Sequence, residues 1–223
     1  MPALMNLKFK SLTPETYRYV IEQRSCVHDP VLDSLWKETE ALGDISRMQI
    51  SAEQGSFMTI LVAALGVRSA IEIGTFTGYS SICIARGLPS DGRLICCDVS
   101  EEWTSIARRY WARDGVQAKI DLRLGPGADT LRALPANLVF DFAFIDADKT
   151  GYDTYFELLL PKMKPNALFV FDNMFMGIDK DGKPATDPSG RAIHELNRKL
   201  ARDPRVESVL IPVADGLMVC RKK

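Results

Sequence analysis

Polar side chains follow two strongly apolar segments in the second half of the chain. The segment 140–145 is followed by Asp146, and the segment 167–172 ends in Asp172, with Asn173 next to it. If these are neighbouring strands, their ends lie about 4.8 Å apart, and two carboxylates at that separation repel unless a proton or a cation lies between them. With the amide oxygen of Asn173 they form an all-oxygen set suited to Mg²⁺. The sequence thus predicts a metal site, although single acids after strands also commonly cap the next helix or loop.

Lys149 lies three residues after the predicted ligand Asp146. The charged form of a lysine is disfavoured beside a metal ion, so Lys149 could act as a general base toward a hydroxyl group at that ion. The alternative is a solvated surface lysine. Without the neighbouring metal-ligand candidates, this alternative would be preferred. Asp141 and Asp148 are weaker candidates for the metal site. Asp141 lies at the other end of its strand, and Asp148 is expected to point away from the partner of Asp146.

A glycine-bearing segment earlier in the chain indicates a nucleotide-binding turn. An apolar, strand-like run that starts at Ser69 ends in a turn with Gly74 and Gly78, and a helix-compatible stretch follows at once. Glycines there let the backbone pass close to a ligand. Their G-x-x-x-G spacing is not the G-x-G-x-x-G of dinucleotide-binding folds, and Glu72 would repel a pyrophosphate. A cationic or neutral nucleoside fits better, and S-adenosylmethionine, a sulfonium with an amino-acid tail, is such a ligand.

Residues after the next two predicted strands extend this cofactor site. Asp98 lies twenty residues past Gly78, where a carboxylate can accept hydrogen bonds from both ribose hydroxyls. It could instead cap the helix that begins near Ser100. The segment 125–129 contains small residues against which a flat base can lie, with Asp129 or nearby amides available to the adenine edge. An ordinary strand-to-helix turn capped by Asp129 is equally compatible with that segment.

These residues are separated by alternating strands and helices. Strands are predicted at 70–74, 93–98, 120–124, 140–145, 167–172, 206–211 and 216–221, and helices near 79–87, 101–114, 127–133, 152–163 and 189–202. This alternation predicts an α/β fold, a Rossmann-like doubly wound, mostly parallel seven-stranded sheet with helices on both faces. The last two strands are too close for an intervening helix, so they form a hairpin with one antiparallel strand at the C-terminus. Ligands of such sheets bind beyond the carboxyl ends of the strands.

The N-terminal part of the chain is predicted to add helices to this sheet. Thr13-Pro14-Glu15 and Asp29-Pro30 each resemble a capped helix start, with proline in the first turn. The segment 45–56 is predicted to be rich in loops, and a buried helix is predicted at 57–65. We therefore expect one domain over residues 1–223, with residues 1–44 as a helical extension.

Composition excludes several classes of protein. The net charge of the 223 residues is −1, which gives no general attraction to nucleic acid or to an anionic membrane. No apolar run approaches the length of a membrane span, and the first residues match neither a secretory nor a transit pattern. The five cysteines are odd in number, lack metal-type spacing and lie mostly in apolar runs. We expect them to be reduced thiols of a cytoplasmic protein.

The order of these motifs resembles the cation-dependent class I O-methyltransferases, the family of catechol O-methyltransferase and caffeoyl-coenzyme A O-methyltransferase. The resemblance runs from about Met48 to the C-terminus and is carried by five segments: Met48-Gln49-Ile50-Ser51-Ala52-Glu53-Gln54-Gly55, Glu72-Ile73-Gly74-Thr75-Phe76-Thr77-Gly78-Tyr79-Ser80, Phe144-Ile145-Asp146-Ala147-Asp148-Lys149, Asp172-Asn173 and Asp215-Gly216-Leu217. It implies that S-adenosylmethionine is bound by Ile50, Glu72, Gly74, Thr75, Ser80, Asp98 and Gly127. It further implies that Asp146, Asp172 and Asn173 hold Mg²⁺ or a similar ion, that Lys149 and Asp146 are catalytic, and that the protein is a homodimer.

The resemblance implies a metal-dependent transfer of the methyl group of S-adenosylmethionine to a hydroxyl of a catechol-type small molecule. Three departures from the family pattern leave the acceptor open. Met176-Gly177 stand where the plant coenzyme A ester enzymes have Trp-Asn, Val209 stands where catechol O-methyltransferase has a carboxylate near the ring, and Gly127 replaces alanine or serine. Two alternatives remain. An NAD-dependent oxidoreductase is disfavoured by the missing G-x-G-x-x-G and by Glu72, whereas a non-catalytic S-adenosylmethionine-binding module would leave the metal cluster and Lys149 without a purpose.

Overall fold

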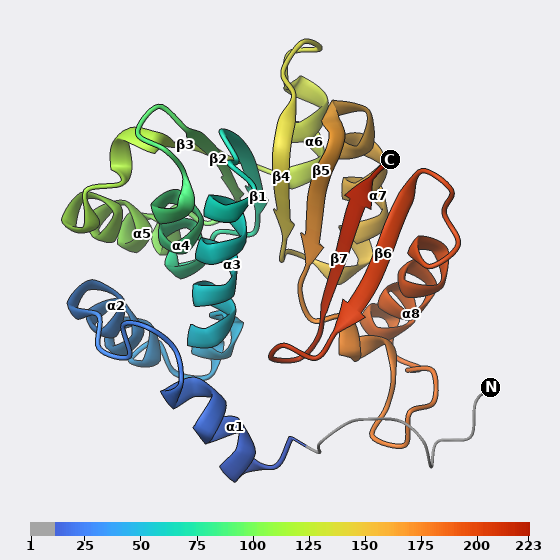
Figure 1. Cartoon of the computed structure of the whole chain (residues 1–223), viewed down its shortest axis with the longest axis horizontal. Helices are drawn as coiled ribbons and strands as arrows, with labels where there is room; N and C mark the ends of the chain where they lie inside the picture. The colour runs from blue at the N-terminus through green and yellow to red at the C-terminus, as the bar shows by residue number, and fades with distance from the viewer. Residues whose placement is uncertain (1–11) are drawn as a thin grey trace.

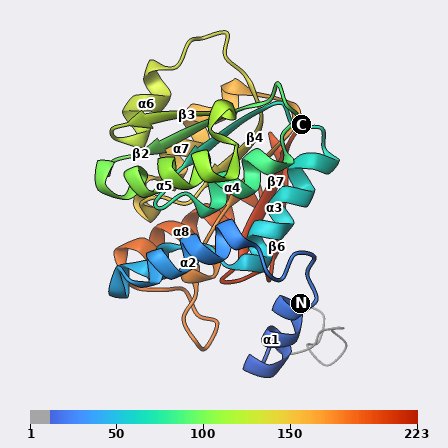
Figure 2. The same cartoon turned by 90° about the vertical axis from the view of Figure 1, so that its left-hand side faces the viewer.

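A seven-stranded sheet runs through the middle of the molecule, as shown in the computed structural model, which describes residues 12–223 (Figures 1 and 2). The sequence predicted no leader pattern in the first residues, and these residues lie outside the described range. The strand order is β3-β2-β1-β4-β5-β7-β6, and β7 runs antiparallel to both of its neighbours. The strands are β1 Ser69–Ile73, β2 Arg93–Asp98, β3 Ile120–Leu124, β4 Phe140–Ile145, β5 Met163–Phe171, β6 Val206–Ile211 and β7 Leu217–Lys222. The predicted fold class is confirmed.

Helices cover both faces of the sheet. They are α1 Pro14–Glu22, α2 Pro30–Glu40, α3 Ala52–Ala64, α4 Tyr79–Gly87, α5 Glu101–Asp114, α6 Gly127–Ala133, α7 Tyr152–Leu159 and α8 Pro188–Leu200, with short 3-10 helices η2 Gly43–Met48, η4 Lys149–Gly151 and η6 Met174–Gly177 among the connections. One buried apolar cluster joins the sheet to α2–α5, and a second joins the other face to α6–α8. The adjacent residues Cys96 and Cys97 belong to different clusters, as the alternation of side chains along a strand requires.

The start of α3 differs from the prediction. The segment 45–56 was expected to be a loop, but η2 occupies its first part and α3 begins at Ala52. Gly55, within the segment predicted as loop, lies inside α3, where α3 and α4 pack closely. A Cβ at Gly55 would lie 2.8 Å from Cys83 Sγ and 2.9 Å from the Tyr79 ring. The helix is also buried on one side only, since Ile60 is 67% exposed.

The two N-terminal helices begin with the predicted caps and lie at one end of the molecule (Figures 1 and 2). Thr13 accepts from the Thr16 amide, and Asp29 accepts from the amides of Val31 and Leu32. The Asp29 carboxylate also pairs with Arg86 of α4, which fastens α2 to the sheet domain. None of the helices in the described part of the chain is long and apolar enough to cross a membrane.

Candidate active site

A cavity of about 1180 Å³ opens where β1, β2, β4 and β5 reach their carboxyl ends. The sheet order reverses at β1, so this is the position at which open α/β sheets bind ligands. The volume exceeds the roughly 300–1,000 Å³ of a usual small-molecule site, which leaves space for two reactants. Its walls include ten residues predicted from the sequence: Ile50, Gly74, Thr75, Ser80, Asp98, Gly127, Asp146, Lys149, Asp172 and Asn173.

The glycine-bearing loop after β1 is fixed from behind by β2 and β4. The Gly74 amide donates to the carbonyl oxygen of Cys97 at 2.9 Å, and Gly74 has a φ of 93°. Any Cβ at this position would collide with the carbonyl oxygen of Asp146. Only glycine therefore allows the strand ends to approach this closely. The loop then leads into α4, whose N-terminal amides begin at the cavity wall.

Asp98 holds the same loop through its carboxylate. Oδ2 accepts from the amides of Thr75 and Phe76 at 2.9 and 2.8 Å, and Oδ1 accepts from the Ser100 amide at 2.8 Å. A carboxylate offers about four acceptor positions, so one remains for a ligand hydroxyl. The alternative of Asp98 as the helix cap is not observed, because Ser100 caps α5.

Glu72 does not reach the cavity wall. It is 0% exposed between Cys96 and Phe144 of the neighbouring strands. Ser80, Cys96 and Thr75 face the carboxylate, but neither of its oxygens has a hydrogen-bond partner in the described structure. Burial raises the pKa of Glu72 to about 8. Any effect of Glu72 on a ligand is therefore exerted through the loop above it, without direct contact.

Asp146 and Asp172 follow paired residues of β4 and β5, since Ile145 lies opposite Phe171. Burial and the charge of Asp146 raise the pKa of Asp172 well above its ordinary value. Burial also raises the pKa of Asp146, although Lys149 opposes this effect. Two buried carboxyl groups that oppose each other's ionisation form a site that gains from a bound cation.

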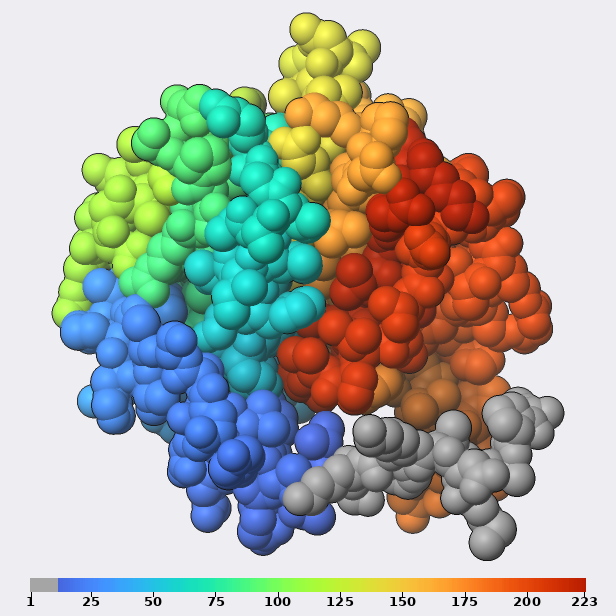
Figure 3. Space-filling view, in the orientation of Figure 1, coloured from blue at the N-terminus to red at the C-terminus, as the bar shows by residue number. Residues whose placement is uncertain are grey.

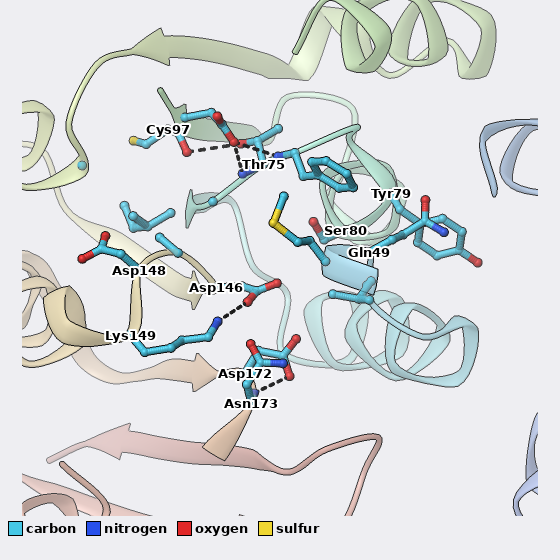
Figure 4. A pocket seen from close by; sticks show the side chains of 18 of the residues that line it. Gln49, Thr75, Tyr79, Ser80, Cys97, Asp146, Asp148, Lys149, Asp172 and Asn173 are labelled. Carbon is cyan, nitrogen blue, oxygen red and sulfur yellow. Dashed lines mark hydrogen bonds and ion pairs between the residues drawn. The ribbon is translucent and has the colours of Figure 1, made fainter. Parts of the chain in front are cut away.

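Lys149 is directed inward, to Asp146 (Figure 4). Its Nζ donates to Asp146 Oδ1 and to the Tyr152 hydroxyl, both at 2.8 Å. The two charged side chains are only 15% and 14% exposed. Lys149 is therefore not a solvated surface lysine. Tyr152 was not predicted as a site residue. Its position three residues after Lys149, about one helical turn further along the chain, could have indicated the contact.

Asn173 completes the group in an unusual backbone conformation, with a φ of 57°. Its amide N–H donates to Asp172 Oδ1 at 2.7 Å, and its side-chain Nδ2 donates to Asp215 Oδ2 at 2.7 Å. Among the described residues, no three His, Cys, Asp or Glu side chains converge as a metal-binding group. Two carboxylates and one amide oxygen are nevertheless a hard, all-oxygen set, and Mg²⁺ commonly takes only one or two protein carboxylates and keeps other positions open. The residues present therefore fit such an ion.

The sequence and the fold are similar to those of known O-methyltransferases. Residues 22–223 match the model of the O-methyltransferase family. Probable caffeoyl-CoA O-methyltransferase 2 of Dictyostelium discoideum is 41% identical over 179 residues, covering 78% of each chain. Caffeoyl-CoA O-methyltransferase of Petroselinum crispum is 32% identical over 92% of this chain and 90% of its own. The solved O-methyltransferase from Bacillus cereus in complex with SAH has a TM-score of 0.83 and 31% identity over 92% of this chain and 96% of its own.

The chain belongs to the O-methyltransferase family. The resemblance inferred from its motifs is thereby confirmed, and the chain is an enzyme, an S-adenosylmethionine-dependent O-methyltransferase of the caffeoyl-CoA type. An NAD-dependent oxidoreductase and a non-catalytic binding module are no longer needed as alternatives.

Asp129 of this O-methyltransferase lies elsewhere than expected. Asp129 pairs with Arg132 on the exposed side of α6, lies outside the cavity wall and does not cap the helix. Asp148, expected to point away from Asp172, the partner of Asp146, lines the cavity and accepts a hydrogen bond from Tyr155, which lines it too. The Tyr155 ring lies beside Gly127, where a Cβ would lie 2.9 Å from Ile73 Cγ2 and 3.2 Å from that ring. Val209 is 56% exposed and does not line the cavity.

Proposed function

We propose that this O-methyltransferase moves the methyl group of S-adenosylmethionine to one hydroxyl of a vicinal dihydroxy aromatic molecule, and that a divalent cation such as Mg²⁺ assists the transfer. The observation that carries the proposal is the buried contact of Lys149 with Asp146, next to a second acid, Asp172, whose pKa is raised by burial and by the charge of Asp146. A pair of acids and a lysine in this arrangement serves catalysis better than stability, because burying the charges is unfavourable.

The cofactor half of the cavity follows from the backbone. The loop from Gly74 to Gly78 and the amides at the start of α4 suit the polar tail of the cofactor. Asp98 has one acceptor position left for a ribose hydroxyl. Gly127 and Tyr155 offer a close, flat wall for the adenine ring, and Asp148 beside them offers an acceptor for its amino group.

Asp146, Asp172 and the Asn173 amide oxygen would hold the cation. When bound, it would make the acceptor hydroxyl more acidic and offset the two carboxylate charges. Lys149 then removes the hydroxyl proton. Asp146 and the Tyr152 hydroxyl hold its Nζ from two directions, so that the base is positioned before the acceptor arrives. Orienting the two reactants in line supplies most of the rate.

The acceptor half of the cavity lies toward the N-terminal elements. Met48 of η2 and Met176 of η6 line it, and they are 42% and 40% exposed. Thioether side chains adapt to aromatic rings of different shape and attract them. Two adjacent ring hydroxyls would offer two oxygens at the cation site. Tyr17 of α1 also lines this half and donates to Glu53 of α3.

We propose two further properties, a cytoplasmic location and pairing of two copies of the chain. Only Cys26 of the five free cysteines is exposed, a pattern that suits a reducing compartment. Exposed apolar side chains support pairing: Ile60 at 67%, Leu65 at 51% and Val209 at 56% exposure. Ile60 belongs to α3, Leu65 follows the last residue of that helix, and Val209 belongs to β6. Figure 3 shows α3 beside the β6–β7 hairpin on one face. Surface apolar groups of this kind favour association.

Methyl transfer from labelled S-adenosylmethionine to a panel of catechols, with Mg²⁺ and with EDTA, tests the reaction. The panel includes caffeic acid and its coenzyme A ester, and monohydroxy analogues serve as controls. We expect turnover of diols only, lost with EDTA and restored by Mg²⁺. Full turnover in EDTA would refute the role of the cation.

Two variants separate the roles of the acid and the base. Asp146→Ala should abolish metal-dependent turnover and leave cofactor affinity largely intact. Lys149→Met should keep cofactor and cation binding but lower kcat about 10²–10⁴-fold, the usual contribution of a general base. A Lys149→Met enzyme with near-normal kcat would contradict the assignment of the base.

A further inference from the structure

The Asp215-Gly216 turn between β6 and β7 is hydrogen-bonded to the segment that follows β5. The amide of Met174 donates to the carbonyl oxygen of Gly216, and the amide of Phe175 donates to that of Asp215, both at 2.9 Å. The side chain of Asn173 adds the third bond, from Nδ2 to Asp215 Oδ2 at 2.7 Å. Three consecutive residues after β5 are thus fixed by one turn from a different part of the chain.

The turn is fitted tightly against this segment. Gly216 has a φ of 98°, in the left-handed region that favours glycine. A Cβ there would lie 2.7 Å from the Phe175 ring and 2.9 Å from the Phe175 amide nitrogen. The turn cannot move away from Asn173 without breaking both backbone bonds, so the backbone of Asp215 stays within reach of the Asn173 side chain.

The chemistry of the contact decides which way the Asn173 amide faces. An ionised carboxylate only accepts hydrogen bonds, whereas an asparagine amide has a donor side and an acceptor side. Asn173 must therefore turn Nδ2 toward Asp215, and its Oδ1 faces away from that carboxylate. Without Asp215, the amide could rotate by half a turn and present hydrogens to the cation site, which would repel a cation.

We infer that Asp215 is a positioning residue that orients Asn173 Oδ1 toward the cation held with Asp146 and Asp172. The inference rests on the proposed cation site. It gives the Asp215-Gly216 motif a function, which the proposed reaction does not. Asp215 is placed to act through Asn173, because its Oδ2 already accepts from the Asn173 side chain. Partners that orient a metal ligand commonly contribute about 10–100-fold to metal affinity.

The test is the affinity of the full chain, saturated with SAH, for Mn²⁺, followed by the electron paramagnetic resonance signal of the free ion. Asp215→Ala should weaken binding about 10–100-fold. Asp215→Asn should restore most of the affinity, because its amide oxygen still accepts from Nδ2. Glu207→Ala, which removes an exposed acid of the same hairpin, should leave the affinity unchanged.

A double-mutant cycle with Asn173→Gly completes the test. Glycine tolerates the positive φ of this position, so the variant removes the amide without strain. If Asp215 acts only through Asn173, adding Asp215→Ala to Asn173→Gly should produce little further loss. Additive losses, or an Asp215→Asn variant as weak as Asp215→Ala at equal melting temperature, would overturn the positioning role alone. A wild-type chain that binds no Mn²⁺ would overturn the cation site as well.

Discussion

Glu72 shows how a single buried side chain can influence a site without entering it. Its carboxyl group lies beneath the cofactor loop, and neither oxygen has a hydrogen-bond partner in the described structure. Buried polar groups without such a partner are rare in folded proteins. A raised pKa of about 8 means that the folded chain holds this proton at neutral pH. The negative charge expected of Glu72 from its residue type is therefore absent from the free enzyme at neutral pH.

The stability of the ligand-free enzyme should accordingly fall as pH rises because of Glu72. The usual pKa of the group is 4.5 and the folded value is about 8. Below pH 4.5 the folded and unfolded chains both hold the proton, and the full stability is present. Between these values only the unfolded chain releases it, so the free energy of unfolding declines by a total on the order of 3–5 kcal/mol.

Glu72→Gln should remove this decline. Urea unfolding at pH 4.5, 6.5 and 8 should show equal stabilities of the two proteins at the lowest pH and an increasing advantage of the variant above it. Glu207→Gln, a change at an exposed acid, serves as the control. Parallel profiles of wild type and Glu72→Gln would show that Glu72 ionises normally in the folded protein.

At the scale of elements, α2 is joined to the cofactor loop by one buried contact. The hydroxyl of Thr39, in the last turn of α2, donates to that of Thr77 in the loop after β1 at 2.9 Å. Both side chains are 0% exposed. An N-terminal helix that precedes the sheet in the sequence therefore supports the loop that the cofactor must contact.

Thr39→Val should destabilise the enzyme by about 1–3 kcal/mol, because it leaves the Thr77 hydroxyl buried without a partner. The double variant Thr39→Val/Thr77→Val should lose less than the sum of the two single variants, since both polar groups are then gone. Urea unfolding measures the losses, and SAH titration should show weaker binding in each single variant. Thr16→Val, on the exposed face of α1, should change neither quantity, and additive losses at 39 and 77 would argue against the contact.

Strand positions were predictable from the sequence, but contacts between distant segments were not. Six of the seven observed strands begin and end within one residue of the prediction, because apolar runs and turn residues mark them locally. β5 begins at Met163, four residues early, since Lys164-Pro165-Asn166 interrupts its apolar pattern. The alignment of Asp146 with Asp172 followed from parallel pairing of neighbours, whereas the contact of Asp215 with Asn173 depends on the β6–β7 turn folding back over 42 residues.

At the scale of the whole molecule, one sheet carries both apolar clusters. The strands that support the α2–α5 cluster also support the α6–α8 cluster on their other face. Neither layer of helices can leave without exposing one face of the strands. We therefore propose that the described chain unfolds as one domain, as expected for a single sheet with a core on each side.

Calorimetry of the full chain tests this proposal. We expect one transition whose calorimetric and van't Hoff enthalpies agree per cooperative unit. SAH at a hundred times its Kd should stabilise the enzyme by about 2.7 kcal/mol, which corresponds to a rise in Tm of about 5–10 °C for a chain of this length.

If two copies pair, Tm should also rise with protein concentration, and Ile60→Glu should remove that dependence by placing a charge on the exposed face of α3. Two separate transitions would show that the helical layers unfold independently, and a Tm that does not change with concentration would contradict the coupling of pairing to stability.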